Sequence, residues 1–334
     1  SMLRHADRFF HDGGRRFVLL FDALDRLGTD WKSIRTLTRG VLRLALDLRG
    51  FRALRLKIFM RSDQAADPEI FGFADASKLD SENVKLQWHR PDLYGLLYNW
   101  LWQNPDCGDE FRALVKNTIG GRDSNSLPQN LIEKEPDQQK IFYAMAGELM
   151  GATLRKGRTY SWLHAHLSDA FGETSPRSFL IALRRAAELG PAPTDLIIDR
   201  HGLRAGVQSA STTRIGELKE DYAWIDTVLR ALEGLEVPCD QDSFIGRWQQ
   251  DNIGSKIDEL RKGQVLGPVE LEDGGAGEKG KLEASLLKAL RNIGVVEKRS
   301  DNRINMPDIF RVAAKIKRRG GVSAGGYARV PGRR

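Results

Sequence analysis

The chain has 334 residues, 41% of them apolar and 29% charged, and a net charge of +7 at neutral pH. This composition is typical of a globular protein of two or three domains, and the sequence holds no run of about 18 apolar residues that could cross a membrane. No signal peptide begins the sequence, and its two cysteines, Cys107 and Cys239, give no disulfide framework. The sequence therefore favours a protein of the reducing cytoplasm.

Positive charge is concentrated at the carboxyl-terminal end. Residues 281–334 carry 14 Lys and Arg against 4 Asp and Glu, a net charge of +10, so residues 1–280 carry −3. A basic segment on a nearly neutral body indicates a polyanionic partner. The alternative is a solvated tail, which fits residues 322–334 because they contain little that can pack.

Two short apolar runs, 16–22 and 54–60, predict β-strands near the start of the chain. The segment between them has apolar residues at helical spacing, namely Ile34, Leu37, Val41, Leu44 and Leu48. A helix of this length between two strands predicts a parallel pair, with functional groups at the carboxyl ends of the strands. The polar residues at those ends are Asp22, Arg61, Ser62 and Asp63.

From Pro91 onward the sequence becomes a series of helical segments punctuated by Gly and Pro. A helical region is expected over 91–192, followed by a connector over 193–266 with helices at 213–234 and 240–262. The aromatic residues of the helical region are expected in its core rather than in a binding site. They include Trp100, Trp102, Phe142 and Trp162.

The last part of the sequence begins with a stretch rich in Gly and charge, 267–281, which predicts a linker. The next unit, 282–321, has an amphipathic helix stopped by Gly294, two short strands around a turn at 300–302, and a final basic helix. Helix, hairpin and helix in this order resemble part of a winged-helix domain. The remaining residues, 322–334, form a basic tail.

The first strand carries the most informative motif. An apolar run that ends in Asp22, with Asp25 three residues later, is similar to the Walker B segment of P-loop ATPases of the AAA+ and STAND type. The resemblance implies that Asp22 holds Mg²⁺ through its water shell and that Asp25 orients or deprotonates the attacking water. Ala23 stands where AAA+ proteins have Glu, so the pattern is closer to STAND-like and KAP-like ATPases. The alternative is an Asp that ends a strand and caps the next turn.

The second strand adds to this resemblance. The segment KIFMRSDQ follows one strand–helix–strand unit later, where these ATPases place sensor 1, the polar residue that reads the γ-phosphate. The resemblance implies that Ser62 and Asp63 are candidate sensors and that Arg61 is a sensor or an arginine finger.

A further arginine fits the helical lid of the same families. Ser175 and Pro176 predict the start of a helix. Arg177 in its first turn resembles the sensor 2 arginine, whose planar guanidinium suits phosphate oxygens. The alternative is an ordinary surface arginine, although the helix dipole does not favour positive charge there.

The phosphate-binding loop of these families, G-x-x-x-x-G-K-[ST], does not precede the first strand. Residues 275–282 match part of the pattern, but Leu282 stands where Ser or Thr must bind Mg²⁺, and no apolar strand leads into the segment, so a linker is the better interpretation. Ser1 before Met2 looks like a tag remnant. We therefore expect an upstream ATPase segment to supply the phosphate cradle, and we expect this chain alone to be inactive.

The basic residues of the last unit are candidates for contacts with DNA, because a winged helix places a helix in the major groove and its hairpin on phosphates. They are Lys288, Arg291, Lys298, Arg299, Arg303, Arg311, Lys315, Lys317, Arg318 and Arg319. The alternative is a winged helix that contacts protein. His164 and His166 stand two apart in a predicted helix, so they do not share a face and do not favour a metal site.

The fold class expected from the sequence has three parts. These are a fragment of a parallel P-loop NTPase sheet over 1–90, a mostly α-helical lid and connector, and a carboxyl-terminal winged-helix-like α+β domain. The function expected is that of a cytoplasmic ATP-driven switch that uses ATP and Mg²⁺ in the intact protein. DNA and a second copy of the chain are its expected partners. The competing hypothesis is a non-enzymatic scaffold or nucleic-acid-binding protein with a degenerate ATPase core.

Overall fold

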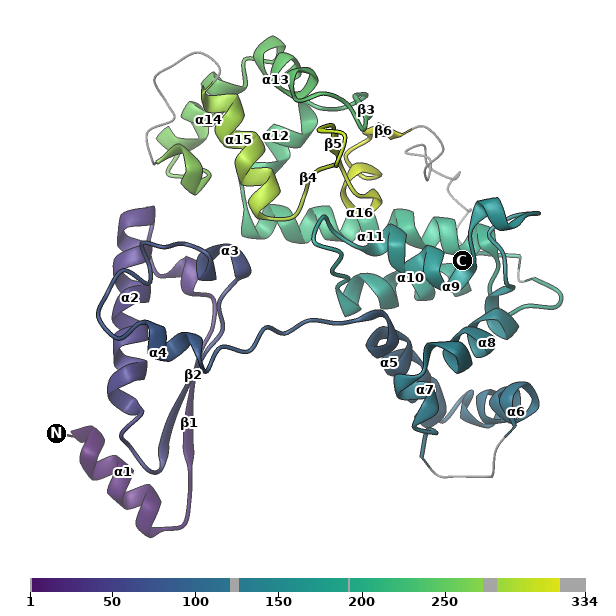
Figure 1. Cartoon of the computed structure of the whole chain (residues 1–334), viewed down its shortest axis with the longest axis horizontal. Coiled ribbons are helices and arrows are strands. Elements are labelled where there is room, and N and C mark those ends of the chain that lie inside the picture. Colours follow the sequence, from purple (N-terminus) through teal and green to yellow (C-terminus); the bar gives the residue numbers. More distant parts are fainter. Residues whose placement is uncertain (1, 121–125, 192, 273–280, 319–334) are drawn as a thin grey trace, which may run out of the picture. The chain divides into compact units, whose positions relative to one another are not determined.

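The structure is a computed structural model that describes residues 2–120, 126–191, 193–272 and 281–318, without the side chains of Asp25 and Asp80. Helices dominate, and the strands are short (Figure 1). The chain divides into two compact units. The first comprises Ser1–Leu86 with Ser255–Ile293, and the second comprises Gln87–Gly254 with Gly294–Arg334. The first unit therefore contains a late segment of the chain, which no pattern in the sequence indicated.

The first unit is built on a two-stranded parallel sheet. Strands β1 (Phe17–Phe21) and β2 (Leu54–Ile58) pair in register from Phe17↔Leu54 to Phe21↔Ile58. Helix α2 (Trp31–Leu48) connects the two strands. The predicted strand–helix–strand order and the parallel pairing are confirmed, because a connection of this length brings the second strand back in the direction of the first.

Helix α2 begins where the sequence offers a cap. The carboxylate of Asp30 accepts the N–H of Ser33 at 2.8 Å, which satisfies one of the free donors of the first turn. Ile34 and Leu48 of the predicted apolar face are buried, whereas Leu37 is 47% exposed. Trp31, at the start of the helix, is buried and donates its indole N–H to the carbonyl of Gly267 at 2.8 Å.

Residues around Gly267, which were expected to begin a linker, pack into the first unit. A short 3-10 helix, η3 (Val269–Leu271), follows, and Leu271 is buried. Helix α15 (Lys281–Asn292) contacts it and buries Leu286 and Leu290. Residues 275–280 of the partial phosphate-loop match lie outside the described residues.

The other elements of the first unit are α-helices and the short 3-10 helix η1. Helix α1 precedes the sheet, and the carboxylate of its Asp7 accepts the N–H groups of Ala53 and Leu54 at 2.7 and 3.0 Å. The elements are α1 (Met2–Asp12), η1 (Leu24–Arg26), α3 (Ser62–Ala65), α4 (Ser77–Asp80) and α14 (Ile253–Lys262), which spans the boundary between the units.

The second unit contains the helical region that the sequence predicts. Its core stacks aromatic rings, with Tyr94 and Tyr160 4.0 Å apart between ring centres. Trp102 and Phe142 are buried as predicted, whereas Trp100 is exposed. The helices are α5 (Arg90–Gln103), α6 (Gly108–Ile119), α7 (Asn130–Glu133), α8 (Glu135–Ala146), η2 (Leu154–Lys156), α9 (Thr159–Leu167), α10 (Pro176–Glu188), α11 (Arg200–Asp221), α12 (Ile225–Arg230) and α13 (Gln241–Gln250).

Two helices predicted for the connector are wrong in extent. The helix expected over 213–234 begins instead at Arg200, because the carboxylate of Asp199 caps it by accepting the N–H of Gly202 at 2.7 Å. The helix expected over 240–262 is interrupted at Asn252, whose φ of 50° is left-handed and ends α13.

The carboxyl-terminal hairpin is confirmed, but the basic helix after it is not. Strands β4 (Glu297–Lys298) and β5 (Ile304–Asn305) pair antiparallel. The expected helix is only the short α16 (Asp308–Arg311). Lys315 then takes a left-handed φ of 55°, and β6 (Lys317–Arg318) pairs with β3 (Glu236–Val237) in parallel. The chain leaves the helical conformation because the N–H of Lys317 donates to Leu235 at 2.8 Å.

Candidate nucleotide site and basic hairpin

The pairing of β1 with β2 brings the polar ends of both strands to one edge of the sheet. The N–H of Phe59 donates to the carbonyl of Phe21 at 2.8 Å, so the strands remain paired up to the residue before Asp22. Arg61 follows only two residues after Phe59. We call Asp22, Arg61, Ser62 and Asp63 the carboxyl edge, because this is the position where open parallel sheets bind ligands.

Asp22 is exposed and makes a local hydrogen bond. Its Oδ1 accepts the N–H of Ala23 at 2.8 Å, and Ala23 lies in the left-handed region with φ 54° and ψ 48°. A residue with a β-carbon is uncommon there, and the buried Leu24 anchors the turn that follows. The local bond also fits the alternative in which Asp22 only caps a turn. The side chain of Asp25 is not among those the structure describes.

Arg61 and Asp63 form a bidentate ion pair. The Nε of Arg61 lies 3.1 Å from Oδ1 of Asp63, and its Nη2 lies 3.1 Å from Oδ2. Both side chains are largely covered, and Ser62 between them is exposed at the start of α3. This fork-to-fork geometry neutralises Asp63, so Asp22 has the more available carboxylate for a cation at this edge.

Gln64, which the sequence did not single out, is buried in α3, two residues after Ser62. It is 3% exposed, and its Nε2 has no hydrogen-bond partner among the described residues. A buried amide donor without a partner is uncommon in proteins. No sequence signal marked it, because a glutamine in a polar loop is normally solvated.

Arg177 belongs to the second unit, whereas the carboxyl edge belongs to the first. It lies in the first turn of α10 as predicted, after Pro176 at the first helical position. Ser175 occupies the cap position, but its side chain makes no capping hydrogen bond. The exposed guanidinium of Arg177 donates to Oε1 of Glu217 on α11 at 2.9 Å. This ion pair stabilises a positive charge that the helix dipole disfavours.

The basic residues of the expected winged helix are divided between the units and between elements. Lys288 and Arg291 are exposed on α15 in the first unit. In the second unit, Lys315 contacts Glu233 at 3.0 Å, and Arg318 contacts Asp308 at 3.3 Å. Lys317 is exposed on β6 rather than on a helix, and Arg319 lies outside the described residues.

The β4–β5 hairpin carries exposed cations close together in the sequence. Lys298, Arg299 and Arg303 are all exposed on or beside its strands. The guanidinium of Arg303 contacts Asp301 in the turn at 2.7 Å. Because this ion pair is neutral overall, Lys298 and Arg299 contribute most of the net positive charge of the hairpin.

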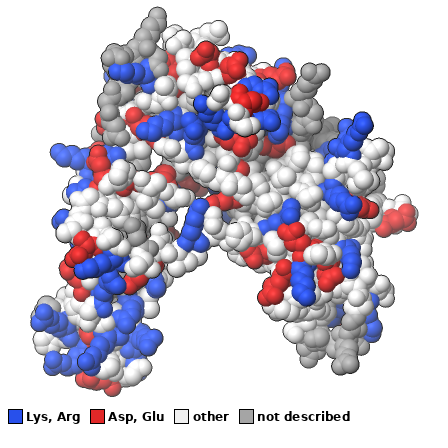
Figure 2. Space-filling model, viewed as in Figure 1, with Lys and Arg blue, Asp and Glu red and all other residues white. Residues whose placement is uncertain are grey.

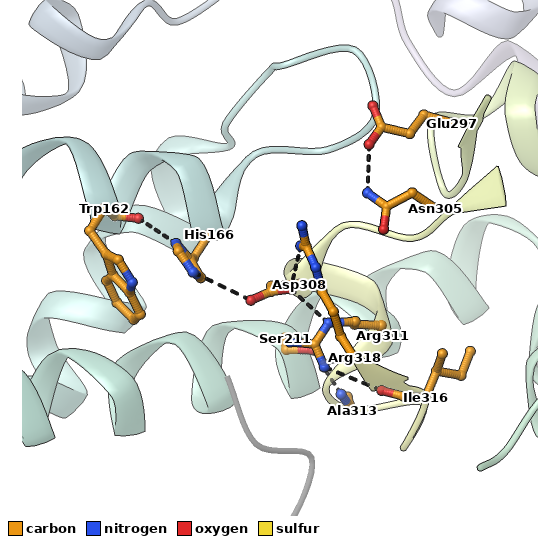
Figure 3. Close-up of polar contacts among 10 residues, drawn as sticks. All are labelled: Trp162, His166, Ser211, Glu297, Asn305, Asp308, Arg311, Ala313, Ile316 and Arg318. Carbon is orange, nitrogen blue, oxygen red and sulfur yellow. Dashed lines mark hydrogen bonds and ion pairs between the residues drawn. The ribbon is translucent and has the colours of Figure 1, made fainter. Parts of the chain in front are cut away.

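A buried charge network is built around Asp308, which follows the hairpin in the sequence (Figure 3). The carboxylate of Asp308 is 2% exposed; its Oδ1 accepts from Nε of Arg311 at 2.7 Å, and its Oδ2 lies 3.6 Å from Nε2 of His166. Burial is the largest influence on the pKa of His166 and lowers it. Arg311, expected to face DNA, is itself buried. The sequence could not show this, because an Asp and an Arg three residues apart are usually solvated.

The two histidines of the H-x-H pattern have separate surroundings. The ring of His166 stacks on Trp162, with the ring centres 4.0 Å apart, whereas Nδ1 of His164 lies 3.5 Å from the hydroxyl of Ser168. Among the described residues, no group of three or more His, Cys, Asp or Glu side chains is arranged to hold a metal ion.

No protein-family model, curated protein or solved structure matches the chain. Within the part of the chain that the structure describes, every helix is too short or too polar to cross a membrane.

Proposed function

We propose that this chain is part of an ATP-binding switch protein of the P-loop type, in which the carboxyl edge forms one side of the nucleotide site. The observation that carries the proposal is the in-register parallel pairing of β1 with β2. It places Asp22 and the Arg61–Asp63 pair after neighbouring strands, at the edge where such sheets bind phosphates. Bound ATP with Mg²⁺ would supply the phosphoryl group and the cation.

Each residue of the edge has a distinct role in this proposal. Asp22 would hold the hydrated cation, because its carboxylate is exposed and accepts a hydrogen bond from the adjacent N–H. Asp25 positions the water. Asp63 holds the Arg61 guanidinium in a fixed fork, from which Arg61 and Ser62 read the terminal phosphate. The role of Arg177 as a sensor 2 arginine stays a prediction of the sequence, because this residue belongs to the second unit.

The proposal requires a phosphate-binding loop from polypeptide outside this sequence. The direct test is ATP hydrolysis by the product of the complete reading frame, with Asp22→Asn compared with Asp12→Asn. Loss of a metal-holding carboxylate should lower kcat by about 100-fold or more, whereas the exposed Asp12 at the end of α1 should be dispensable. A reading frame without G-x-x-x-x-G-K-[ST], or full activity of Asp22→Asn, would support the non-enzymatic scaffold instead.

The hairpin supports a second function, binding of DNA. Lys298 and Arg299 are exposed side by side on an antiparallel hairpin, the shape that lies along a phosphate backbone. Binding to a duplex oligonucleotide should weaken with salt, and Lys298→Glu/Arg299→Glu should reduce the slope of log affinity against log salt by about two. Lys262→Glu is the matched control. An unchanged slope in the hairpin variant would remove this function.

A further inference from the structure

The sheet of the first unit has one face that no described element covers. Val18 of β1 is paired with Arg55 of β2, and two residues later Leu20 is paired with Lys57. Paired residues in parallel strands point to the same side, so these four side chains share one face. We call them the open face. Val18 is 49% and Leu20 is 66% exposed.

The opposite face of the sheet is covered over most of its length, although Phe17 at its start is 43% exposed. This face carries Leu54, which is buried, with Leu19 and Leu56 partly buried beside it. Helix α2 contacts β2, and the exposure of the open face shows that this contact is on the other side. The ring of Phe10 from α1 stacks on Phe17 at 5.1 Å between ring centres, also away from the open face.

The sequence of β1 is not typical of a strand with one solvent-exposed face. Phe17–Phe21 reads FVLLF without a polar residue, and a continuous apolar run is typical of a strand that is buried on both sides. Parallel sheets occur almost only with helices on both faces, since their connections cross over as helices. The exposure of Val18 and Leu20 among the described residues therefore contrasts with what the sequence of the strand favours.

The charges of the open face define the chemistry of an element that could cover it. Lys57 is exposed, and Arg55 is exposed with its guanidinium donating to the carbonyls of Phe51 and Leu54. Figure 2 shows Lys and Arg side chains gathered at the lower left, where α1 and the adjoining end of the sheet lie in Figure 1. Covering these cations without counter-charges would leave them desolvated and unpaired, which is strongly unfavourable.

We infer that the open face docks an amphipathic α-helix that places apolar residues over Val18 and Leu20 and acidic residues over Arg55 and Lys57. Neighbouring strands lie about 4.8 Å apart, and residues two apart on a strand are separated by about 6.6 Å. Residues at i and i+4 of a helix are separated by about 6 Å. The spacing along a helix therefore matches the spacing of Val18 and Leu20 on β1 and of Arg55 and Lys57 on β2. The inference does not depend on nucleotide binding.

Other occupants fit less well. A second copy of the chain would bring Arg55 and Lys57 against the same cations. A single-stranded nucleic acid would satisfy the cations but would find aliphatic side chains in place of the aromatic rings on which bases stack. An acidic amphipathic helix is the partner that satisfies both rows of the open face.

The test is a charge swap measured by fluorescence anisotropy. Two labelled 18-residue helical peptides carry the same leucine stripe, flanked by Glu in one and by Lys in the other. The Glu peptide should bind the wild-type chain at least ten-fold more tightly than it binds Arg55→Glu/Lys57→Glu. The Lys peptide should prefer that variant, a reversal that a misfolded protein could not produce. Leu20→Gln should weaken both peptides.

The controls separate the open face from general electrostatics. Lys32→Glu removes an exposed cation of the same unit, on α2, and should leave the affinity for the Glu peptide unchanged. Equal loss in Lys32→Glu would overturn the inference. So would tight binding of a 20-nucleotide single strand that is lost in Arg55→Glu/Lys57→Glu, or self-association of the wild-type chain that Leu20→Gln abolishes.

Discussion

At the scale of single residues, the structure buries polar side chains whose burial the sequence does not predict. Asp308 and Arg311 form an ion pair whose two side chains are almost fully buried. The guanidinium of Arg318 also contacts Asp308. Breaking such a pair costs about 3–5 kcal/mol. The pair therefore fixes the turn after β5, whereas the sequence pattern indicated a basic helix facing a ligand.

His166 makes the stability of this network depend on pH. Burial lowers the pKa of His166 from its usual 6.5, although nearby Asp308 opposes the shift and Arg318 and Arg311 add to it. The unfolded chain then binds more protons than the folded chain below about pH 6.5, so stability falls as the pH drops through that range.

We predict that His166→Gln flattens this dependence. The urea midpoint of the wild-type chain should decrease between pH 7 and pH 5, and that of His166→Gln should decrease less. His201→Gln, which changes an exposed histidine of the same unit, should follow the wild type. Parallel curves of urea midpoint against pH for the wild type and His166→Gln would show that protonation of His166 does not change the stability of the chain.

At the scale of elements, local patterns predict the helices and strands well where a cap or a long apolar period is present. The β1–α2–β2 order and the antiparallel hairpin follow from such patterns. The short α16 does not, because it ends through the pairing of β6 with β3, which are about 80 residues apart in the sequence. Tertiary pairing of this kind leaves no local signal.

The close packing of α10 against α11 in the second unit also depends on tertiary contact. A β-carbon at Gly206 of α11 would lie 2.2 Å from the carbonyl oxygen of Ala182 on α10. Gly206→Ala should therefore destabilise the chain by about 3 kcal/mol, as in an overpacked core. Gly216 lies in the same helix with nothing within 4 Å of its β-carbon position, so Gly216→Ala should stabilise it by about 0.5–1 kcal/mol. Equal effects in thermal unfolding would contradict this packing.

At the scale of the whole molecule, the sequence predicts a short parallel sheet followed by a helical region, and the structure confirms both. It does not predict that residues 255–293 join the amino-terminal unit, since that association depends on contacts such as Trp31 with Gly267. The carboxyl edge could be located because a parallel connection fixes which strand ends meet. The partners of the side chains at this edge, such as Asp63 for Arg61, could not be predicted from the sequence.

In the proposed function, the carboxyl edge faces the terminal phosphate of ATP. The most direct measurement is photo-crosslinking of the complete protein with an ATP analogue that carries its reactive group on the γ-phosphate, with the modified residues mapped by mass spectrometry. We predict Mg²⁺-dependent labelling within residues 22–25 or 61–64, competed by ATP. Labelling confined to other parts of the protein would contradict it.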